Sequence, residues 1–527
     1  MYWPFALLLT LLVVYVALRP STESNLPNGP RVLLNEKDRR TKLHLYLALW
    51  AKTYGDFFSY RIGHSTAIVL SSMQAIEELL IKKGHIYSSR PTSSSQADII
   101  TGKARIVNMP YGEEFRRTDS THKHRKIIHT LLGIQNAKIF LPYQEYESRQ
   151  TLRNLLHSPD LFYSEMSRYS ASVTFSLLVG ARFDRSDAFL PTIIGEMMQK
   201  FFNNITPGAW LVDLYPFLDY LPGFLAPWRS QAYSIHRELR NFWNVFFHSI
   251  EERVKEGTAP DCFLSRFIRD PESQHLSEIE RITVAAELLT AGTETTATTL
   301  QWFFKVCAIQ SEWIVEAQKE LDTVVGRDRL PDFSDRESLP YITAVVSELH
   351  RWASVTPLAF FHATSQDDTY RGTTIAKSTV VIPNTYAVHH SDEYFANSSA
   401  FLPGRWLSPE DPRHVHDGAK TANHLAFGLG RRECPGKHVA DSSLFIVISR
   451  ILWAFDIERG NPPPSDETVG ALPVLGCAPF KCRITPRSED AARKIRRFAD
   501  HIDPGLHVED GSTYDAQVQA VLSQSRI

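Results

Sequence analysis

The stretch "AFGLGRRECPGKH", residues Ala426 to His438, places one cysteine between a glycine-rich turn and a predicted helix. Gly428 and Gly430 allow a backbone path that side chains would block. Gly436 allows another surface to approach the chain closely. The stretch is therefore expected to form a tightly packed loop around its cysteine.

Cys434 is expected at a helix N-terminus, because Pro435 suits the first turn of a helix. Unpaired N–H groups, the helix dipole and nearby Arg432 favour thiolate over thiol there. A nucleophilic cysteine would need a histidine base, and His438 lies four residues on, away from the turn. A small core residue, a zinc ligand, a nucleophile and a ligand to a larger group are the alternatives.

The remaining composition narrows these alternatives. The chain has 527 residues, with 57 basic against 59 acidic side chains. This balance lacks the excess of positive charge that is typical of nucleic-acid-binding proteins. Its five cysteines are scattered and form no CxxC pair: Cys262, Cys307, Cys434, Cys477 and Cys482. This pattern argues against a disulfide framework and against a structural zinc site.

The pattern Phe427-x-x-Gly430-x-Arg432-x-Cys434-x-Gly436 resembles the haem-binding loop of the cytochrome P450 family at every signature position. In that family the cysteine thiolate is the axial ligand of the haem iron. The resemblance implies Cys434 as the iron ligand, with Phe427 and Arg432 among the haem-binding residues.

A second motif is "AGTETT", Ala291 to Thr296, inside the longest predicted helix. Glycine and threonine lower helix propensity, and threonine hydroxyls can bond to carbonyls one turn earlier. Alone, the stretch reads as a packing irregularity. Beside Cys434 it resembles the family's oxygen-binding groove, which implies that Gly292 leaves room for dioxygen. It also implies that Glu294 and Thr295 deliver protons during oxygen activation.

A third motif is "ELHR", in which Glu348 and Arg351 lie three residues apart on one helix face. Alone, this is an ordinary intrahelical pair. With Arg405 of "FLPGRW" it resembles the family's structural triad, which implies a role in holding the proximal side of the haem loop.

Haem carries two propionates, so cations should converge on them. The resemblance implies Arg432, His362, His124 and Arg125 for this role, and a solvated basic residue is the alternative for each. The helix bearing Arg125 departs from the family pattern. Phe115 replaces its usual tryptophan, and "RTDSTH" (residues 117–122) is inserted, which we expect to form a loop or cap.

The N-terminus carries an apolar run of 17 residues, Tyr2 to Leu18. At about 1.5 Å per residue it reaches roughly 25 Å, the short end for a bilayer span. A cleaved signal peptide is the alternative, but the basic n-region and the cleavage site are missing. The basic residues that follow keep the rest of the chain cytosolic by the positive-inside rule. We expect a single-pass anchor in the endoplasmic reticulum.

The predicted fold is mainly α with minor β: one large helical domain plus small sheets, the cytochrome P450 fold. Apolar periodicity predicts helices around 161–180, 188–204, 229–256 and 278–310. "FFSYRIGHSTAIVLSS" predicts a hairpin, and "TVVIPNTYAV" a short strand entering a loop. The expected units are an anchor (1–20), a hinge (21–30), the haem domain (31–488) and a polar tail (489–527).

The motifs occur in the family's order. "YQEYESRQTLRNLL" and "RRECPGKHVADSSLFI" are most similar to fungal secondary-metabolism members, such as the O-methylsterigmatocystin oxidoreductase group. The resemblance implies a membrane-anchored monooxygenase that uses haem b and acts on a small lipophilic substrate. Electrons would come from NADPH through a separate reductase. Arg431 and Lys437 are candidates to meet an acidic face of it, and a solvated pair of basic residues is the alternative.

Two other functions stay open. One is a reductase-independent isomerase or dehydratase, against which Glu294 and Thr295 argue; the other is a non-catalytic haem-binding protein. The sequence does not specify a substrate. We expect the pocket to be shaped by residues 91–110 and by residues near Ala285, Leu289, Leu358 and Ala478.

Overall fold

The structure, a computed structural model, describes residues 26–32, 34–62, 65–91, 95–111, 132–133, 137–206, 209–410, 424–499 and 508–525. In this part of the chain, no helix combines the length and the apolar composition that a bilayer crossing requires. The expected anchor and the insertion at residues 117–122 lie outside it.

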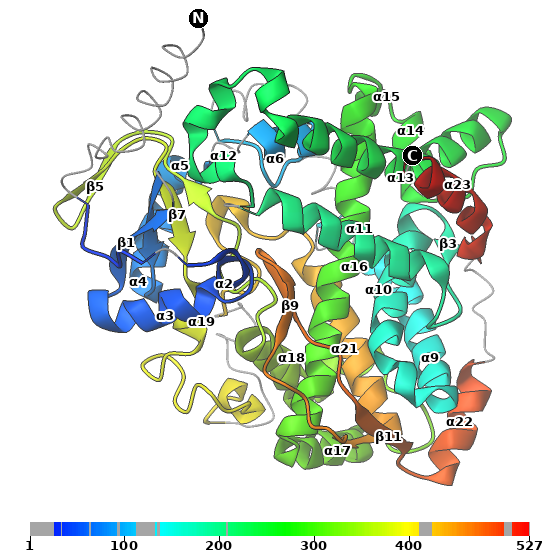
Figure 1. The fold of residues 1–527 in the computed structure, drawn as a ribbon. Coiled ribbons are helices and arrows are strands. Elements are labelled where there is room, and N and C mark those ends of the chain that lie inside the picture. The colour runs from blue at the N-terminus through cyan, green and yellow to red at the C-terminus, as the bar shows by residue number, and fades with distance from the viewer. Residues whose placement is uncertain are drawn as a thin grey trace, which may run out of the picture.

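Helices dominate the molecule (Figure 1). The α-helices are α2 (Glu36–Thr41), α3 (Leu43–Tyr54), α4 (Met73–Ile76), α5 (Gly84–Tyr87), α6 (Ser95–Thr101), α9 (Leu141–His157), α10 (Phe162–Leu178), α11 (Phe189–Ile205), α12 (Leu211–Leu214), α13 (Pro227–Glu256), α14 (Phe263–Arg269), α15 (Pro271–Gln274), α16 (Glu278–Ile309), α17 (Glu312–Val324), α18 (Pro340–Trp352), α19 (Thr385–His389), α21 (Lys437–Ala454), α22 (Glu489–Ala499) and α23 (Asp515–Ser525).

Short helical turns and strands connect them. The turns are the π-helical η1 (Glu77–Lys82) and the 3-10 turns η2 (Ala137–Phe140), η3 (Pro159–Leu161), η4 (Pro216–Tyr220), η5 (Gly223–Leu225), η6 (Phe333–Ser338), η7 (Pro403–Trp406), η8 (Gly430–Arg432) and η9 (Gly511–Tyr514). The strands are β1 (Phe57–Ile62), β2 (Ser65–Leu70), β3 (Ala181–Arg182), β4 (His362–Ala363), β5 (Asp368–Tyr370), β6 (Thr373–Ile375), β7 (Val380–Pro383), β8 (Phe455–Arg459), β9 (Thr468–Ala471), β10 (Val474–Cys477), β11 (Cys482–Pro486) and β12 (Glu509–Asp510).

The four long helices expected from apolar periodicity are present as α10, α11, α13 and α16. α16 begins with a capping box, in which Ser277 N donates to Glu280 Oε2 at 2.8 Å. α13 begins at Pro227 and ends before Gly257, whose φ of +75° is left-handed. Local sequence signals therefore fix both ends of α13 and the start of α16.

α16 is the central element of the domain (Figure 1). Its 32 residues extend about 48 Å at 1.5 Å per residue. Leu300, Phe303 and Phe304 belong to one apolar cluster with α9, α10, α17, α18 and α21. Ile282 and Leu288 belong to a second cluster with α10, α11, α13 and α14. The "AGTETT" stretch lies between the two clusters, where α16 is free to line a cavity.

The largest sheet has four strands in the order β1-β2-β7-β4. β1 and β2 form the expected antiparallel hairpin, in which Ile62 pairs with Ser65. β7 adds parallel to β2, and β4 adds antiparallel to β7. The other sheets have two strands each. The predicted fold class, mainly helical with small sheets, is confirmed.

The segment after β7 is helical instead of the expected loop. The Asn384 side chain accepts a hydrogen bond from Ala387 N at 3.3 Å and caps α19. Asparagine is among the best N-caps, so the short helix has a clear local cause.

Part of the expected polar tail packs on the domain. Ala491 and Ile495 of α22 are buried, one turn apart. β12 pairs parallel with β3, and Tyr514 and Val518 join the apolar cluster around α13. A few apolar residues are enough to pack this segment on the domain, because each of them lies on its buried face. The average composition of residues 489–527 is polar and therefore did not predict this packing.

Candidate active site

A cavity of about 380 Å³ separates the cysteine loop (residues 426–436) from α16. Cys434 lines it from the loop, and Gly292, Glu294 and Thr295 line it from α16. Apolar side chains complete the walls, among them Leu132, Phe140, Val173, Leu178, Met198, Phe201, Val355 and Val474. Motifs about 140 residues apart in the sequence thus face one space.

The cysteine loop is closed by its own backbone and by docking on η1. Cys434 N donates to Phe427 O at 2.8 Å. Gly430 has a φ of +63°, and a Cβ there would lie 2.7 Å from Leu80 O. Only glycine fits this conformation and this approach. α21 begins at Lys437, so Pro435 lies before the helix and not in its first turn as predicted.

The surroundings of the Cys434 side chain do not by themselves favour a thiolate. Burial raises the pKa of the thiol, and a hydrogen bond from the Gly436 backbone only partly opposes this. The Arg432 guanidinium instead donates to backbone carbonyls, including those of Ser88 at 2.9 Å and Met109 at 2.6 Å. Without a coordinated cation, desolvation outweighs the helix dipole, and the thiolate stays a prediction. A coordinated metal cation would supply the missing positive charge and deprotonate the thiol.

The groove on α16 has the chemistry expected of a proton relay. Thr295 Oγ1 donates to Ala291 O at 2.8 Å, one turn earlier, so its oxygen stays available as an acceptor. Burial raises the pKa of Glu294 to about 7. A carboxyl group with this pKa exchanges protons readily near neutral pH.

Gly292 is required by packing. A Cβ at this position would lie 2.9 Å from Thr174 Oγ1 and 3.2 Å from its Cγ2 on α10. Ser170 Oγ, also on α10, donates to Gly292 O at 2.9 Å. The glycine therefore permits close contact between α10 and α16 as well as lining the cavity.

Arg432 and His362 line the cavity together with Arg90, which the sequence did not single out. Arg90 donates to the carbonyls of Val107 at 2.8 Å and Phe361 at 2.8 Å. These acceptors are neutral, so the contacts leave the positive charge of Arg90 uncompensated. Burial and repulsion from Arg432 hold the pKa of Arg90 well below its ordinary value.

His362 is neutral in this cluster. Its Nδ1 lies 2.7 Å from Tyr87 O, and a carbonyl only accepts, so Nδ1 carries the proton. Burial, with the charges of Arg90 and Arg432, holds the pKa of His362 well below its usual range. No periodicity marks Arg90 in the sequence; only the fold shows that it joins the other two.

The remaining predicted haem contacts lie outside the described residues. These are His124 and Arg125, together with Phe115 and the expected helix start near His122. Their roles stay predictions.

The structure brings Glu348, Arg351 and Arg405 into contact. Glu348 Oε1 accepts from Arg351 Nη2 at 2.7 Å and from Arg405 Nε at 3.1 Å. Its Oε2 accepts from Arg351 Nε at 2.8 Å and from Trp406 Nε1 at 2.9 Å. Glu348 and Arg351 are fully buried, so every partner is needed to offset the cost of desolvation.

This network reaches the cysteine loop through a histidine. Arg351 Nη1 donates to His389 O at 2.7 Å, and Leu425 N donates to His389 Nε2 at 2.8 Å. The pKa of His389 is far below its ordinary value because the ring is buried and lies near the Arg351 guanidinium, so Nε2 is free to accept. Leu425 immediately precedes the loop, which is thereby tied to α18.

Two further histidines pack against the loop, and no sequence motif marks them. The His350 ring lies 4.9 Å from that of His424 and 4.7 Å from that of Phe427. Burial lowers the pKa of His350 to about 4, and that of His424 is also far below its usual range. Both rings are therefore neutral near pH 7.

The pocket prediction was correct in part. Arg105, within the expected segment 91–110, lines the cavity. Ala285, Leu289, Leu358 and Ala478 themselves are not among the described residues that line it, but Leu288 and Ala359, which adjoin Leu289 and Leu358 in the chain, are. The α16 face turned to the cavity also carries Glu287 and Ala291.

The two basic residues expected to meet a reductase have partners within the chain. Lys437 Nζ lies 2.7 Å from Glu433 Oε1, and Arg431 donates to the Tyr111 hydroxyl. Arg431 stays exposed on the surface of the loop. A reductase surface at this place stays a prediction.

Comparison with known proteins identifies the family. The profile described as cytochrome P450 matches residues 23–478. Cytochrome P450 monooxygenase polD of Polytolypa hystricis is 35% identical over 507 residues, which cover 93% of this chain and 95% of that protein. Cytochrome P450 monooxygenase fogE of Aspergillus ruber is 34% identical over 473 residues, covering 86% and 85%. Cytochrome P450 monooxygenase verL of Clonostachys rogersoniana is 32% identical over 522 residues, covering 95% of each.

The chain belongs to the cytochrome P450 family, as its motifs predicted. It is an oxidoreductase, an enzyme of the cytochrome P450 monooxygenase type. Family membership implies a haem iron as the cofactor.

The residues of the cavity fit such a cofactor. The half-buried Cys434 offers a soft ligand for iron on one wall. The buried Arg90 and the half-buried Arg432 repel one another, and two propionates would neutralise them. The apolar walls suit a flat, largely apolar ring.

Proposed function

We propose that this chain is a membrane-anchored haem-thiolate monooxygenase that inserts one atom of dioxygen into a small lipophilic substrate. The observation that carries the proposal is the single cavity lined by Cys434, Glu294 and Thr295. The second oxygen atom leaves as water, which takes two electrons and two protons per turnover.

In this proposal Cys434 holds the haem iron, and Arg90, Arg432 and His362 hold the propionates, with His124 and Arg125 completing the set. Phe427 packs at the cysteine loop, and Gly292 leaves room on the opposite wall. The bound haem supplies the binding and reductive activation of dioxygen. The triad of Glu348, Arg351 and Arg405 fixes the loop through His389.

Glu294 and Thr295 move the protons. The pKa of Glu294, about 7, supports a carboxyl that gives up and regains a proton in each turnover. The Thr295 oxygen, held by its bond to Ala291 O, is placed to pass a proton into the cavity. A reductase-independent isomerase or dehydratase would not need this pair.

We assign the electrons to NADPH through a separate diflavin reductase, and the anchor to residues 1–20 in the endoplasmic reticulum membrane. The apolar run Tyr2 to Leu18 and its basic flank support the anchor. We assign the reaction to fungal secondary metabolism, which the fungal sources of the relatives support.

The test is metabolite profiling of a fungal or yeast host that expresses this chain with a cytochrome P450 reductase, under ¹⁸O₂. We expect a new product that carries one ¹⁸O atom and that requires both NADPH and the reductase. A product formed without reductase or without label would favour an isomerase or dehydratase. The absence of turnover on a broad substrate panel would favour a non-catalytic haem protein.

A further inference from the structure

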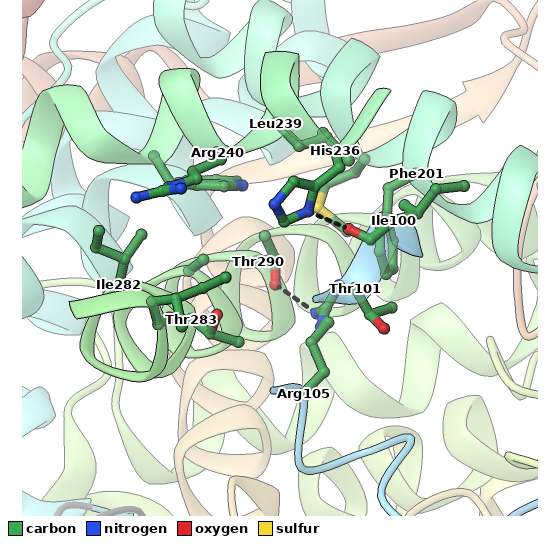
Figure 2. Close-up of a pocket in the computed structure, with 14 residues that line it drawn as sticks. Ile100, Thr101, Arg105, Phe201, His236, Leu239, Arg240, Ile282, Thr283 and Thr290 are labelled. Carbon is green, nitrogen blue, oxygen red and sulfur yellow. Dashed lines mark hydrogen bonds between the residues drawn. The ribbon is translucent and has the colours of Figure 1, made fainter. Parts of the chain in front are cut away.

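A side chamber of about 60 Å³ adjoins the main cavity between α6, α11, α13 and α16 (Figure 2). Arg105, Met198, Phe201 and Thr290 line both spaces, so the chamber and the main cavity share a wall. A space of this size holds about four water molecules, enough for a carboxylate group.

The titratable side chains that line the side chamber are basic. Arg105, His236 and Arg240 line it, and Figure 2 shows all three around one space. None of its described lining residues is acidic. The Arg240 Nε is buried without a hydrogen-bond partner, and its Nη2 lies 3.6 Å from Glu278 Oε1.

The hydroxyl groups of the chamber do not add donors. Thr101, Thr283 and Thr290 each donate to a backbone carbonyl of their own helix, at 2.8, 2.7 and 3.2 Å. His236 Nδ1 is likewise directed at Ile100 O, at 3.1 Å. The hydrogen-bond donors left for a ligand are therefore chiefly the two guanidinium groups, which favours an anion.

Arg105 lies between the side chamber and the main cavity and lines both. Its Nη2 lies 3.3 Å from Thr290 Oγ1, and its Nε lies 3.4 Å from Glu287 Oε1. Both contacts are longer than an ordinary N–H···O bond of about 2.9 Å, so they hold the donors weakly. The guanidinium carbon lies 4.2 Å from the centroid of Phe201, which orients its plane.

We propose that the substrate is an amphipathic carboxylic acid, whose carboxylate binds Arg105 at the side chamber while its apolar body extends over Cys434. This rests on the proposed function, because it names the substrate class of the same site. Thr290 and Thr295 are five residues apart on α16, about 7.5 Å along the helix axis. The oxidised carbon is therefore remote from the carboxylate.

Glu287 is the counter-charge of Arg105 in the ligand-free protein. It lines the main cavity, and burial raises the pKa of its carboxyl despite the nearby guanidinium. A substrate carboxylate competes with Glu287 for Arg105. Removing the negative charge of Glu287 should therefore strengthen acid binding, whereas removing Arg105 should weaken it.

The test compares dodecanoic acid with its methyl ester by isothermal titration calorimetry on the purified holoenzyme. The ratio of the two affinities within one variant cancels differences in folded fraction. We expect the wild type to prefer the acid. Arg105→Gln should lower this preference about 10- to 100-fold, the range of one charge-assisted hydrogen bond. Arg105→Lys should retain part of it, and Glu287→Gln should raise it.

Arg281→Gln is the matched control, because the Arg281 side chain is 16% exposed against 15% for Arg105 and lines neither cavity. It should leave the preference unchanged. Equal binding of acid and ester by the wild type, or an unchanged ratio in Arg105→Gln, would overturn the inference. Calorimetry does not depend on iron ligation. If the protein prefers the acid but incorporates no ¹⁸O into a product, the proposed function is rejected and the inference about acid binding stands.

Discussion

Thr295 makes a single side-chain hydrogen bond to Ala291 O within its own helix, so its hydroxyl can be removed without breaking a contact between elements. Thr295→Ala should leave haem and substrate binding intact. Proton delivery should fail, and NADPH oxidation should release hydrogen peroxide in place of product. The measurement is the ratio of product to NADPH consumed, with peroxide assayed in parallel.

Thr295→Ser keeps the hydroxyl and serves as the control, with most of the wild-type coupling expected. Unchanged coupling in Thr295→Ala would remove Thr295 from the proton relay. Glu294→Gln, which cannot ionise, should also uncouple the reaction, since burial poises the pKa of Glu294 at about 7.

His350 gives the fold a defined sensitivity to acid. Its pKa is about 4 in the folded protein because of burial, against an ordinary value of 6.5. The folded state resists protonation of His350. The contribution of the neutral ring to the free energy of unfolding is therefore complete above pH 6.5 and is lost as pH falls toward 4. The difference corresponds to about 3 kcal/mol of unfolding free energy.

His350→Phe removes the titrating group but keeps a ring for the contact with His424 and Phe427. Since His350 Nε2 has no hydrogen-bond partner, little should be lost at pH 8. Denaturant unfolding between pH 8 and 4 should show a loss of stability about 3 kcal/mol smaller in the variant. Identical pH profiles would show that His350 is not a buried neutral ring.

At the scale of elements, the close contact between α10 and α16 explains why residue 292 is glycine. Gly292→Ala would place a Cβ 2.9 Å from Thr174 Oγ1. Overpacking of this kind costs about 1–3 kcal/mol. Urea unfolding should show the loss in Gly292→Ala and its recovery in the double variant with Thr174→Ala.

Gly195→Ala in α11 is the matched helical control, because nothing lies within 4 Å of a Cβ there. Alanine exceeds glycine in helix propensity, so this variant should be as stable as the wild type or more stable. A failure of Thr174→Ala to restore stability would assign Gly292 to the cavity alone.

The helices and strands were predictable from the sequence where residues within the element itself determine its structure and its ends. The long helices follow from apolar periodicity, and their ends follow from caps such as Ser277 and Gly257. The rotation of α16 was not predictable at the same precision. Each residue turns the helix by about 100°, so a prediction of residues near Leu289 leaves open that its neighbour Leu288 faces the cavity.

Site residues were predictable where a motif carries them. Cys434, Glu294 and Thr295 lie in contiguous motifs, and the fold brings them to one cavity. Arg90 and Arg105 carry no such signal, because an isolated arginine in a polar segment reads as a solvated residue. Their roles arise from packing between segments far apart in the chain.

At the scale of the whole molecule, membrane attachment should depend on a segment separate from the described domain. The apolar run lies within residues 1–20, and the domain from Leu26 onward has its own core. Deleting residues 1–20 should move most of the protein from carbonate-washed membranes to the supernatant, with haem content retained. Retention of the truncated protein in those membranes would place the main membrane contact elsewhere.

The function proposed for the whole cavity depends on one atom, the sulfur of Cys434, as the ligand of the haem iron. The most direct test is the absorption spectrum of the reduced carbon monoxide complex of the full-length protein. The wild type should show the red-shifted Soret band of a thiolate-ligated haem, and Cys307→Ala, which removes a buried cysteine elsewhere in the chain, should keep it. Cys434→Ala should lose the band, whether or not haem is retained; a Cys434→Ala protein that keeps it would contradict the account.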